Sequence, residues 1–502
     1  HHFKQSIKKT YALQNDLYRY QLYVQQNPQA KDPVDTLVKA LPLLDSLQQA
    51  ANHTTHPLSR LENILSFYSN KSEQTADSIY NKALQTIVAP EIQNDLEEYL
   101  HSANTKNPAH VYTALKAYLM LNDTNHFQAE FIANTLGKIT TTPLNSEAIH
   151  QLAMHINAAF SLHAMTMQLD QSLIADTRKQ LVNMPSAELA FVILKNMNEN
   201  NADSTIALGT NLGRPPVFVS KQVLNRIPKM FTATHFQKIM SDEINIAAAE
   251  ALKGNWITGD VTPSINQPAA DTLIAQLQNE YLEKYVDIWE SQLANIQPNT
   301  PKNLLQADEM IQNLTNNNSP LLQLLQTIRQ NTAFDAIMSA SPKITVLNNL
   351  INNPNLQESS LYQVFVDLKQ LHIYLQKILN SSAPDKNAFA AAADRMENPA
   401  QNPITAIHQL AEKNPEPLKS WLNTLANQSW DFILQKASDH IQNAWQTSVL
   451  PIYNQQIANH YPFAQNSNND VNLEQFTRFL GHRGTLANYY LIYLRPFVND
   501  TN

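Results

Sequence analysis

The sequence predicts an all-α protein made of several helical bundles, and three observations favour this fold class. Glycine accounts for only 7 of the 502 residues, and glycine supplies the positive φ angles of hairpin turns and phosphate-binding loops. Apolar residues recur at helical spacing along most of the chain. The 26 prolines fall mostly between these periodic segments. Because 502 residues exceed a single ordinary core, we expect several domains.

The first clear helix is predicted after residue 107. Asn107 is expected to be its N-cap and Pro108 its first residue, because proline is well tolerated where the backbone N–H has no partner. Apolar residues at helical spacing form one face: Val111, Leu115, Tyr118 and Leu119.

Two longer helices are predicted further along the chain. Residues 271–293 carry an apolar stripe at spacings of three and four, namely Leu273, Leu277, Tyr281, Tyr285 and Ile288. Residues 430–457 form a second helical region, for which Ser429 is the expected N-cap. Its stripe contains Trp430, Ile433, Leu434, Ala437, Ile441, Ala444 and Trp445.

Breaks in the periodicity divide the chain into four predicted segments. An N-terminal helical part at 1–205 is followed by an irregular, Gly/Pro-containing segment at 206–268. A middle bundle at 269–382 and a C-terminal helical domain at 383–502 complete the chain. At most a few short strands are expected near 215–262, where "PPVFVS" and "NWITGDV" could pair with each other.

The stretch "NHYPFAQNSNNDVNLEQFTRFLGHRG", residues 459–484, is predicted to be a corner between two helices. Pro462 would end the preceding helical region, and Tyr461 and Phe463 would pack against neighbouring helices. Asp470 or Asn472 would cap the next helix.

The helix after this corner is predicted to bury four residues, Leu473, Phe476, Phe479 and Leu480. Gly481 would end it in the left-handed conformation. Gly484 is the second glycine of the "LGHRG" turn.

The chain carries none of the motifs that would predict catalysis or cofactor binding. It lacks the P-loop, the dinucleotide-binding glycines, the nucleophile elbow and H-E-x-x-H. With no cysteine, it has no disulfide, thiolate metal site or cysteine nucleophile. A formal net charge of −8 disfavours nucleic-acid binding. We therefore predict that the chain has no catalytic, cofactor-binding or metal-binding residue and that it is not an enzyme.

Histidine pairs and acidic pairs have ordinary explanations. His53 and His56 are predicted to be solvated, because no third or fourth zinc ligand is evident. His155 and His163 are assigned to helix packing or the surface rather than to a ligand pair. The pairs Glu97–Glu98 and Asp242–Glu243 are interpreted as solvated helix faces. His1 and His2 are compatible with a tag remnant, so no metal site is assigned to them.

Several stretches, in order, resemble the periplasmic region of the IcmF/TssM family. They are "VYTALKAYLMLND" (111–123), "IPKMFTATHFQKIM" (227–240) with "NWITGD" (255–260), "YLEKYVDIWESQL" (281–293) with "SPLLQLLQTI" (319–328), and the block from "YPF" to "YLRPFV" (461–498). The resemblance marks a set of structural motif residues: Tyr118, Trp256, Gly259, Trp289, Tyr461, Pro462, Phe463, Asp470, Phe476, Phe479, Gly481 and Gly484.

The resemblance has departures that favour one branch of the family. His460 stands where arginine is common, "LGHRG" replaces a Phe-Gly-Pro-x-Gly pattern, and "LANYY" replaces a Leu-Asp-x-Phe-Phe type. Together with the high Asn/Gln content, they favour IcmF of a type IVB (Dot/Icm) secretion system over a type VI TssM.

The resemblance implies a scaffold, the periplasmic portion of a bacterial inner-membrane protein. The family's membrane helices and P-loop are not in this sequence, which has no apolar run of about 18 residues and no signal-peptide pattern. The family's β-sandwich would follow residue 502, so a fragment cut on both sides is expected. The implied partners are an IcmH/DotU-type inner-membrane protein, periplasmic core-complex subunits and further copies in a ring. The alternatives are a helical hydrolase acting on peptidoglycan and a soluble adaptor that binds effectors.

Overall fold

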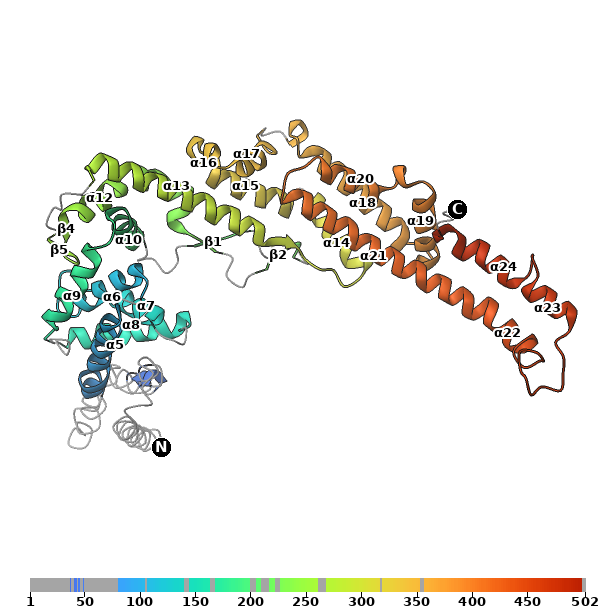
Figure 1. The fold of residues 1–502 in the computed structure, drawn as a ribbon, viewed down its shortest axis with the longest axis horizontal. Coiled ribbons are helices and arrows are strands. Elements are labelled where there is room, and N and C mark those ends of the chain that lie inside the picture. The colour runs from blue at the N-terminus through green and yellow to red at the C-terminus, as the bar shows by residue number, and fades with distance from the viewer. Residues whose placement is uncertain are drawn as a thin grey trace, which may run out of the picture. The chain divides into compact units, whose positions relative to one another are not determined.

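The computed structural model confirms an all-α fold (Figure 1). It describes residues 80–103, 106–139, 144–162, 168–198, 205–208, 216–221, 226–260, 268–316, 318–352 and 356–498, with isolated positions between 37 and 48. These residues belong to two compact units, the first from 1–203 and 238–280, the second from 204–237 and 281–502. The division of the chain into four segments remains a prediction. His53, His56 and His163 lie outside the described residues.

The first unit is helical apart from one short strand pair. Its elements are a π-helical turn η1 (Leu84–Val88), α5 (Ala89–His101), α6 (Pro108–Met120), α7 (Ala129–Ile139), α8 (Ser146–Ser161), α9 (Gln171–Val182), α10 (Ser186–Asn198), a π-helical turn η4 (Ile239–Glu243), α12 (Ile244–Lys253), β4 (Gly254–Asn255) and β5 (Gly259–Asp260). Two further helices, α11 (Ala233–Lys238) and α13 (Ala270–Asn295), have residues in both units.

The second unit contains α21, which at 27 residues is longer than the 26-residue α13. It comprises β1 (Thr205–Ala207), β2 (Phe218–Ser220), β3 (Arg226–Pro228), the 3₁₀ turn η3 (Lys229–Phe231), β6 (Ile296–Pro298), α14 (Leu304–Thr315), α15 (Pro320–Thr332), α16 (Asp335–Ala340), α17 (Pro342–Asn349), η5 (Leu356–Glu358), α18 (Tyr362–Leu379), α19 (Pro384–Glu397), η6 (Pro399–Gln401), α20 (Pro403–Glu412), α21 (Leu418–Ala444), the π-helical turn η7 (Trp445–Val449), α22 (Leu450–Gln456), α23 (Leu473–Leu480), α24 (Thr485–Tyr489), the π-helical turn η8 (Tyr490–Leu494) and the 3₁₀ turn η9 (Arg495–Phe497).

Helix α6 begins as the sequence predicts. The side chain of Asn107 accepts a hydrogen bond from the backbone N–H of Ala109 at 2.9 Å, and Pro108 is the first helical residue. Tyr118, which belongs to the predicted stripe and to the motif set, is fully buried. Its hydroxyl donates to Glu97 at 2.5 Å and accepts from the backbone N–H of Asp170 at 2.8 Å, so this tyrosine joins α5, α6 and the start of α9.

The strand pairing differs from the expectation. Strand β2 pairs antiparallel with β6, β4 with β5, and β1 with β3. The predicted pairing of 215–220 with 255–261 is therefore wrong. Positive φ angles at Gly254 and Gly259 (90° and 70°) instead fold the second segment back on itself.

The "NWITGD" motif is a tightly bonded turn inside the first unit. Asn255 accepts from the backbone N–H groups of Ile257 and Thr258, both at 2.9 Å. Arg178 of α9 donates to the carbonyls of Trp256 and Ile257 at 2.9 and 2.8 Å. The Trp256 ring stacks on another side chain of the same unit, His126, at a centroid distance of 4.2 Å. The motif residues Trp256 and Gly259 thus lie in a turn that α9 holds from one side.

The buried stripe of α13 ends in an aromatic ladder in the second unit. Tyr281, Tyr285 and Trp289 are all fully buried, so the stripe continues to Trp289 rather than to Ile288, which is half-buried. Each ring donates one hydrogen bond to a carbonyl: Tyr281 to Met230 (2.6 Å), Tyr285 to Asn331 (2.6 Å) and Trp289 to Phe231 (2.8 Å). The ladder therefore ties η3 and the end of α15 to α13.

Helix α21 starts earlier than predicted. It begins at Leu418, so the assignment of Ser429 as an N-cap is wrong. Ser429 is fully buried within the helix, and its hydroxyl donates to the carbonyl of Leu425 at 2.8 Å, the local bond that serine makes inside a helix. The helical path continues through η7 and α22 to Gln456.

Two acidic side chains predicted to be solvated are instead bonded within the first unit. Glu97 accepts from Gln93 at 2.6 Å as well as from Tyr118. Glu243 is buried, where it lies 2.8 Å from the ammonium of Lys238 and accepts from Asn198 at 2.8 Å. Their neighbours Glu98 and Asp242 are exposed, as expected.

Candidate interaction surface

Titratable residues do not gather into a metal centre in the described part of the chain, where no group of three or more His, Asp or Glu could hold an ion. Among the same residues, no helix combines the length and the apolar character that crossing a membrane requires.

His155 is a packed core residue of the first unit. It is fully buried, with Nδ1 2.9 Å from the hydroxyl of Tyr80 and Nε2 2.9 Å from Asp45. If Nε2 carries the proton, the neutral ring accepts from Tyr80 and donates to Asp45. Burial lowers the pKa of His155 below its usual value, and the nearby carboxylate of Asp45 opposes that shift. The assignment of His155 to helix packing is confirmed.

The low pKa of His155 predicts a loss of stability in mild acid. Above the unfolded-state pKa of about 6.5, the ring is neutral in both states. As the pH falls below that value, the unfolded chain takes up a proton that the folded unit resists, so unfolding becomes more favourable. We expect a lower melting temperature at about pH 5.5 than at about pH 7.5. His155→Asn should be less stable than the wild type at the higher pH, but its melting temperature should fall less between the two pH values. An equally steep fall in melting temperature would contradict the burial of a neutral His155.

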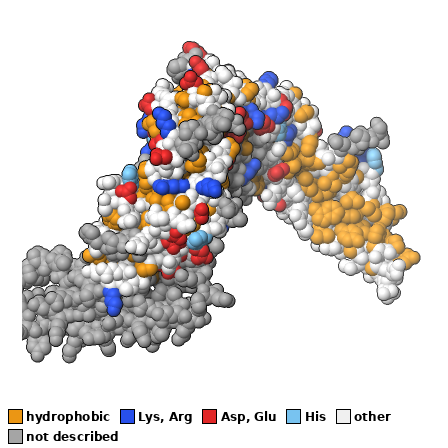
Figure 2. Space-filling model, turned by 60° about the vertical axis from the view of Figure 1, so that its left-hand side comes forward, with side chains coloured by type: hydrophobic (Ala, Val, Ile, Leu, Met, Phe, Trp, Pro, Cys, Tyr) orange, Lys and Arg blue, Asp and Glu red, His pale blue; other side chains and the backbone are white. Residues whose placement is uncertain are grey.

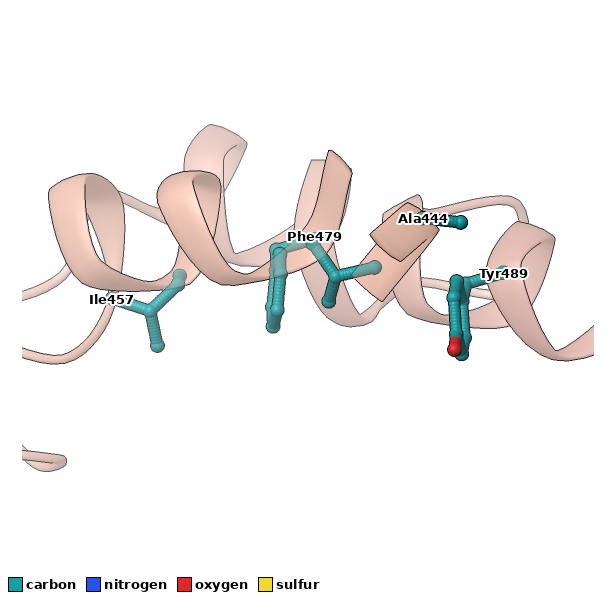
Figure 3. Close-up of a cluster of buried hydrophobic side chains, with 5 residues drawn as sticks. Ala444, Ile457, Phe479 and Tyr489 are labelled. Carbon is teal, nitrogen blue, oxygen red and sulfur yellow. The ribbon is translucent and has the colours of Figure 1, made fainter. Parts of the chain in front are cut away.

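The last part of the second unit is a helical hairpin, which we define as residues 441–498. Its first leg is the end of α21 with η7 and α22, and its second leg is α23, α24, η8 and η9 (Figure 1). A small core joins the legs (Figure 3), consisting of Ala444, Val449, Ile457, Phe479 and Tyr489. The hydroxyl of Tyr489 also donates to the carbonyl of Ile441 at 2.9 Å, which fastens the second leg to the first.

The loop between the legs is closed by backbone hydrogen bonds. The N–H of Tyr461 donates to the carbonyl of Asn469 at 2.8 Å, and the N–H of Val471 donates to that of Tyr461 at 3.0 Å. Asp470 therefore lies opposite Tyr461 in an isolated bridge. Asn472 is the N-cap of α23, accepting from Glu474 at 2.8 Å, so the Asn472 alternative is confirmed.

The helical region before this corner ends at Gln456, one residue before the predicted Ile457. The predicted packing of the corner aromatics is wrong. Tyr461 and Phe463 are exposed rather than packed against neighbouring helices; Phe463 is 42% exposed, with its ring 6.1 Å from that of Phe476.

Of the four residues predicted to be buried on α23, only Phe479 is. Leu473 is 79% exposed, Leu480 is exposed and Phe476 is half-buried. The physical reason is that α23 has only eight residues and packs on a single neighbouring leg, which can cover a narrow stripe.

The two glycines of "LGHRG" are required by close packing of backbone rather than by a left-handed conformation. Gly481 has φ −65° and ψ 166°, so the predicted left-handed end is wrong. A Cβ at Gly481 would lie 2.3 Å from the carbonyl oxygen of Thr477, and one at Gly484 would lie 2.7 Å from that of Phe479. Only glycine fits these contacts without a backbone shift, so the tight turn between α23 and α24 depends on both glycines.

Large apolar side chains are exposed along the hairpin. We call this set the apolar face: Tyr461, Phe463, Leu473, Leu480, Leu486, Tyr490, Leu491, Ile492 and Val498. Figure 2 shows hydrophobic side chains gathered on the C-terminal arm of the chain. A shallow hollow of about 730 Å³ lies beside it, lined by Leu473, Thr477, Arg478 and His482 among others. A contiguous exposed patch of this kind is typical of a protein interaction site.

The sequence contains a signal for this face that motif reasoning missed. Residues 441–469 include no Asp, Glu, Lys or Arg, and Tyr489–Leu494 is an unbroken apolar run. A helix that is apolar on every side is normally buried on every side. In the hairpin, the first leg covers only one side of the second leg.

Comparisons with known proteins place the chain among secretion-system proteins. The model of the family IcmF-related, described as intracellular multiplication and human macrophage-killing, matches residues 41–333. The model described as type VI secretion protein IcmF helical domain matches residues 436–496, which include most of the hairpin.

One relative and two solved structures illustrate these matches. The type VI secretion system component TssM1 of Pseudomonas aeruginosa is 23% identical over 473 residues, covering 84% of this chain and 42% of the relative. The chain thus spans about two fifths of that relative. A type VI secretion system membrane core complex (17% identity, TM-score 0.48, 62% of each chain) and a type VI membrane complex (17%, 0.45, 63% and 60%) are similar solved structures.

Proposed function

This chain belongs to the IcmF-related family, and from that membership we propose that it is a structural, non-catalytic part of a secretion-system membrane complex. One relative, TssM1, is a component of a type VI secretion system. Neither alternative from the sequence, the peptidoglycan hydrolase or the effector adaptor, is favoured by an observation on the described residues, and neither is proposed.

The structural observation that supports this proposal is the apolar face of the hairpin. Interface cores are depleted of charged residues and enriched in aromatic ones. The first leg and the loop, residues 441–469, contain no Asp, Glu, Lys or Arg. The aromatic side chains of Tyr461, Phe463 and Tyr490 are exposed on the apolar face. A helical segment that presents such a surface suits a subunit whose task is to hold other subunits.

The finer assignment follows the sequence resemblance. We place this region in the periplasm as part of an inner-membrane protein that supports a trans-envelope complex. Its proposed partners are an IcmH/DotU-type protein, mainly through the family's N-terminal part, periplasmic core-complex subunits and further copies in a ring. The departures at His460, "LGHRG" and "LANYY" support the type IVB system.

Isolation of the complete gene product from its own bacterial membranes tests this role. After mild crosslinking, we expect subunits of one envelope-spanning secretion complex to co-isolate in fixed proportion, and those of a type IVB system in particular. Co-isolation of type VI subunits would correct the system but keep the role. Recovery of the protein without any secretion subunit would contradict it.

The side of the membrane can be tested separately because the chain has no cysteine. A single cysteine at the exposed Leu305 of α14 should react with a membrane-impermeant maleimide in intact cells whose outer membrane is permeabilised. Labelling only after lysis would contradict a periplasmic position.

A further inference from the structure

The hollow beside the apolar face is lined by charged side chains as well as apolar ones. It follows α23 and the turn after that helix, and its lining includes Leu473, Arg478 and Arg483. The side chains of Leu473 and Arg478 are 79% and 70% exposed, so another molecule can reach them. The volume of about 730 Å³ lies within the range of about 300–1,000 Å³ that is usual for ligand pockets.

Arg483 contributes a positive charge to the hollow that is not neutralised within the described residues. Arg478 is already paired, with its guanidinium 3.0 Å from the carboxylate of Glu474 in the same lining. The side chains of Arg483 and its neighbour His482 have no hydrogen bond or ion pair to any described residue. The backbone carbonyl of Arg483 accepts from the side chain of Asn488 at 3.2 Å, which holds the turn that carries the arginine. Because a guanidinium has five N–H donors, the hollow presents donors that still need acceptors.

The charge around the hollow is opposite to that of the chain as a whole. Residues 471–499 contain three arginines and a single acidic residue, whereas the whole chain carries a formal charge of −8. A negatively charged ligand is therefore attracted to this region in preference to the rest of the chain. Arginine binds carboxylates through parallel pairs of N–H donors, so a carboxylate suits the unpaired guanidinium of Arg483.

The composition of the hollow restricts the kind of ligand. Anionic membranes attract clusters of about four to eight Lys or Arg residues, and nucleic acids require several phosphate contacts. Two arginines and no lysine line the hollow. Leu473 offers an apolar contact in the same hollow, which a small free anion does not use. A protein segment supplies both groups at once, a carboxylate for Arg483 and an apolar side chain for Leu473.

We propose that this hollow binds an acidic segment of a partner protein, in which Asp or Glu residues flank a leucine-sized apolar side chain. The carboxylates of the segment accept hydrogen bonds from Arg483 and from the remaining N–H groups of Arg478, and its apolar side chain packs on Leu473. Charged contacts at the edge of an apolar surface select one partner and one orientation over others. This inference rests on the proposed structural role and deepens it by naming the chemistry of one partner segment.

Fluorescence polarisation with the 502-residue protein tests this site. The probe is a fluorescein-labelled peptide, Asp-Glu-Leu-Asp-Glu-Leu-Asp-Glu, which we expect to bind. Arg483→Glu should weaken its binding on the order of 100-fold, because a carboxylate then faces the carboxylates of the peptide. Leu473→Ser should weaken it by about tenfold through the lost apolar contact. With serine in place of both leucines of the peptide, Leu473→Ser should have no effect and Arg483→Glu should keep its effect.

Arg495→Glu is the matched control for Arg483→Glu. It makes the same change of charge at an exposed arginine of η9, outside the hollow, and should bind the peptide like the wild type. All these variants replace exposed side chains and should retain the wild-type melting temperature.

Four outcomes would overturn the proposal. They are a peptide that does not bind at millimolar concentration, equal binding by the wild type and Arg483→Glu, an equal loss of binding in Arg495→Glu, and equally tight binding of a peptide with lysine in place of every acidic residue. Co-sedimentation with phosphatidylglycerol vesicles that depends on Arg483, without binding of the peptide, would assign the hollow to lipid and likewise reject the proposal. A protein that does not bind the peptide but still co-isolates with secretion subunits would reject this site while leaving the structural role in place.

Discussion

Trp289→Ala is expected to destabilise the second unit by about 3–5 kcal/mol, the usual cost of removing a large buried aromatic side chain. The ring is fully buried at the end of the α13 ladder, 6.5 Å from the ring of Tyr285. Its removal also leaves the carbonyl of Phe231 without the hydrogen bond that Trp289 donates. Denaturant unfolding followed by circular dichroism measures the change.

Trp289→Phe separates the two contributions of this side chain. Phenylalanine keeps much of the apolar volume but lacks the indole N–H, so we expect a smaller loss than for alanine. Equal unfolding free energies for the alanine variant and the wild type would contradict the view that the ladder fixes η3 against α13.

Phe479→Ala is the second change with a large expected effect. Phe479 is the one buried residue of α23, and it packs in the small core that joins the two legs of the hairpin. We expect a loss of up to about 3–5 kcal/mol, confined to the hairpin because few other buried side chains hold it. Hydrogen exchange should show faster exchange in α23 and α24 with little change in the amides of α13.

Phe463→Ala is the matched control for that experiment. The sequence places both phenylalanines in the same motif and predicts both to be buried, but Phe463 is exposed. Its truncation should change stability by no more than about 0.5 kcal/mol. A large destabilisation by Phe463→Ala, or none by Phe479→Ala, would contradict the packing described for the hairpin.

The fold class and the main helices could be predicted from the sequence because they depend on local physics. The low glycine content disfavours hairpin turns along the whole chain. The start of α6 depends only on Asn107 and Pro108, and the buried stripe of α13 depends only on the four-residue spacing within that helix, at Leu273, Leu277, Tyr281 and Tyr285. The strand pairs could not be predicted, because strands of two or three residues carry no periodic pattern. Their register depends on which segments the helices bring together.

The candidate surface was harder to predict than the fold. Helical spacing identifies which side chains share a face of α23, but not whether a second element covers that face. Leu473 and Leu480 follow the spacing of a buried stripe and are exposed, since α23 packs against one leg only. The π-helical turns η7 and η8 also rotate the residues that follow them, and the sequence has no simple signal for such turns.

The apolar face of the hairpin is the surface through which we propose that this chain works as a structural subunit of a secretion complex. The most direct measurement is secretion by the bacterium that carries the gene, with the complete protein bearing Ile492→Glu or the control Leu305→Glu. We expect Ile492→Glu to abolish secretion at an unchanged protein level, and Leu305→Glu to secrete like the wild type. Normal secretion by the Ile492→Glu strain would contradict this proposal.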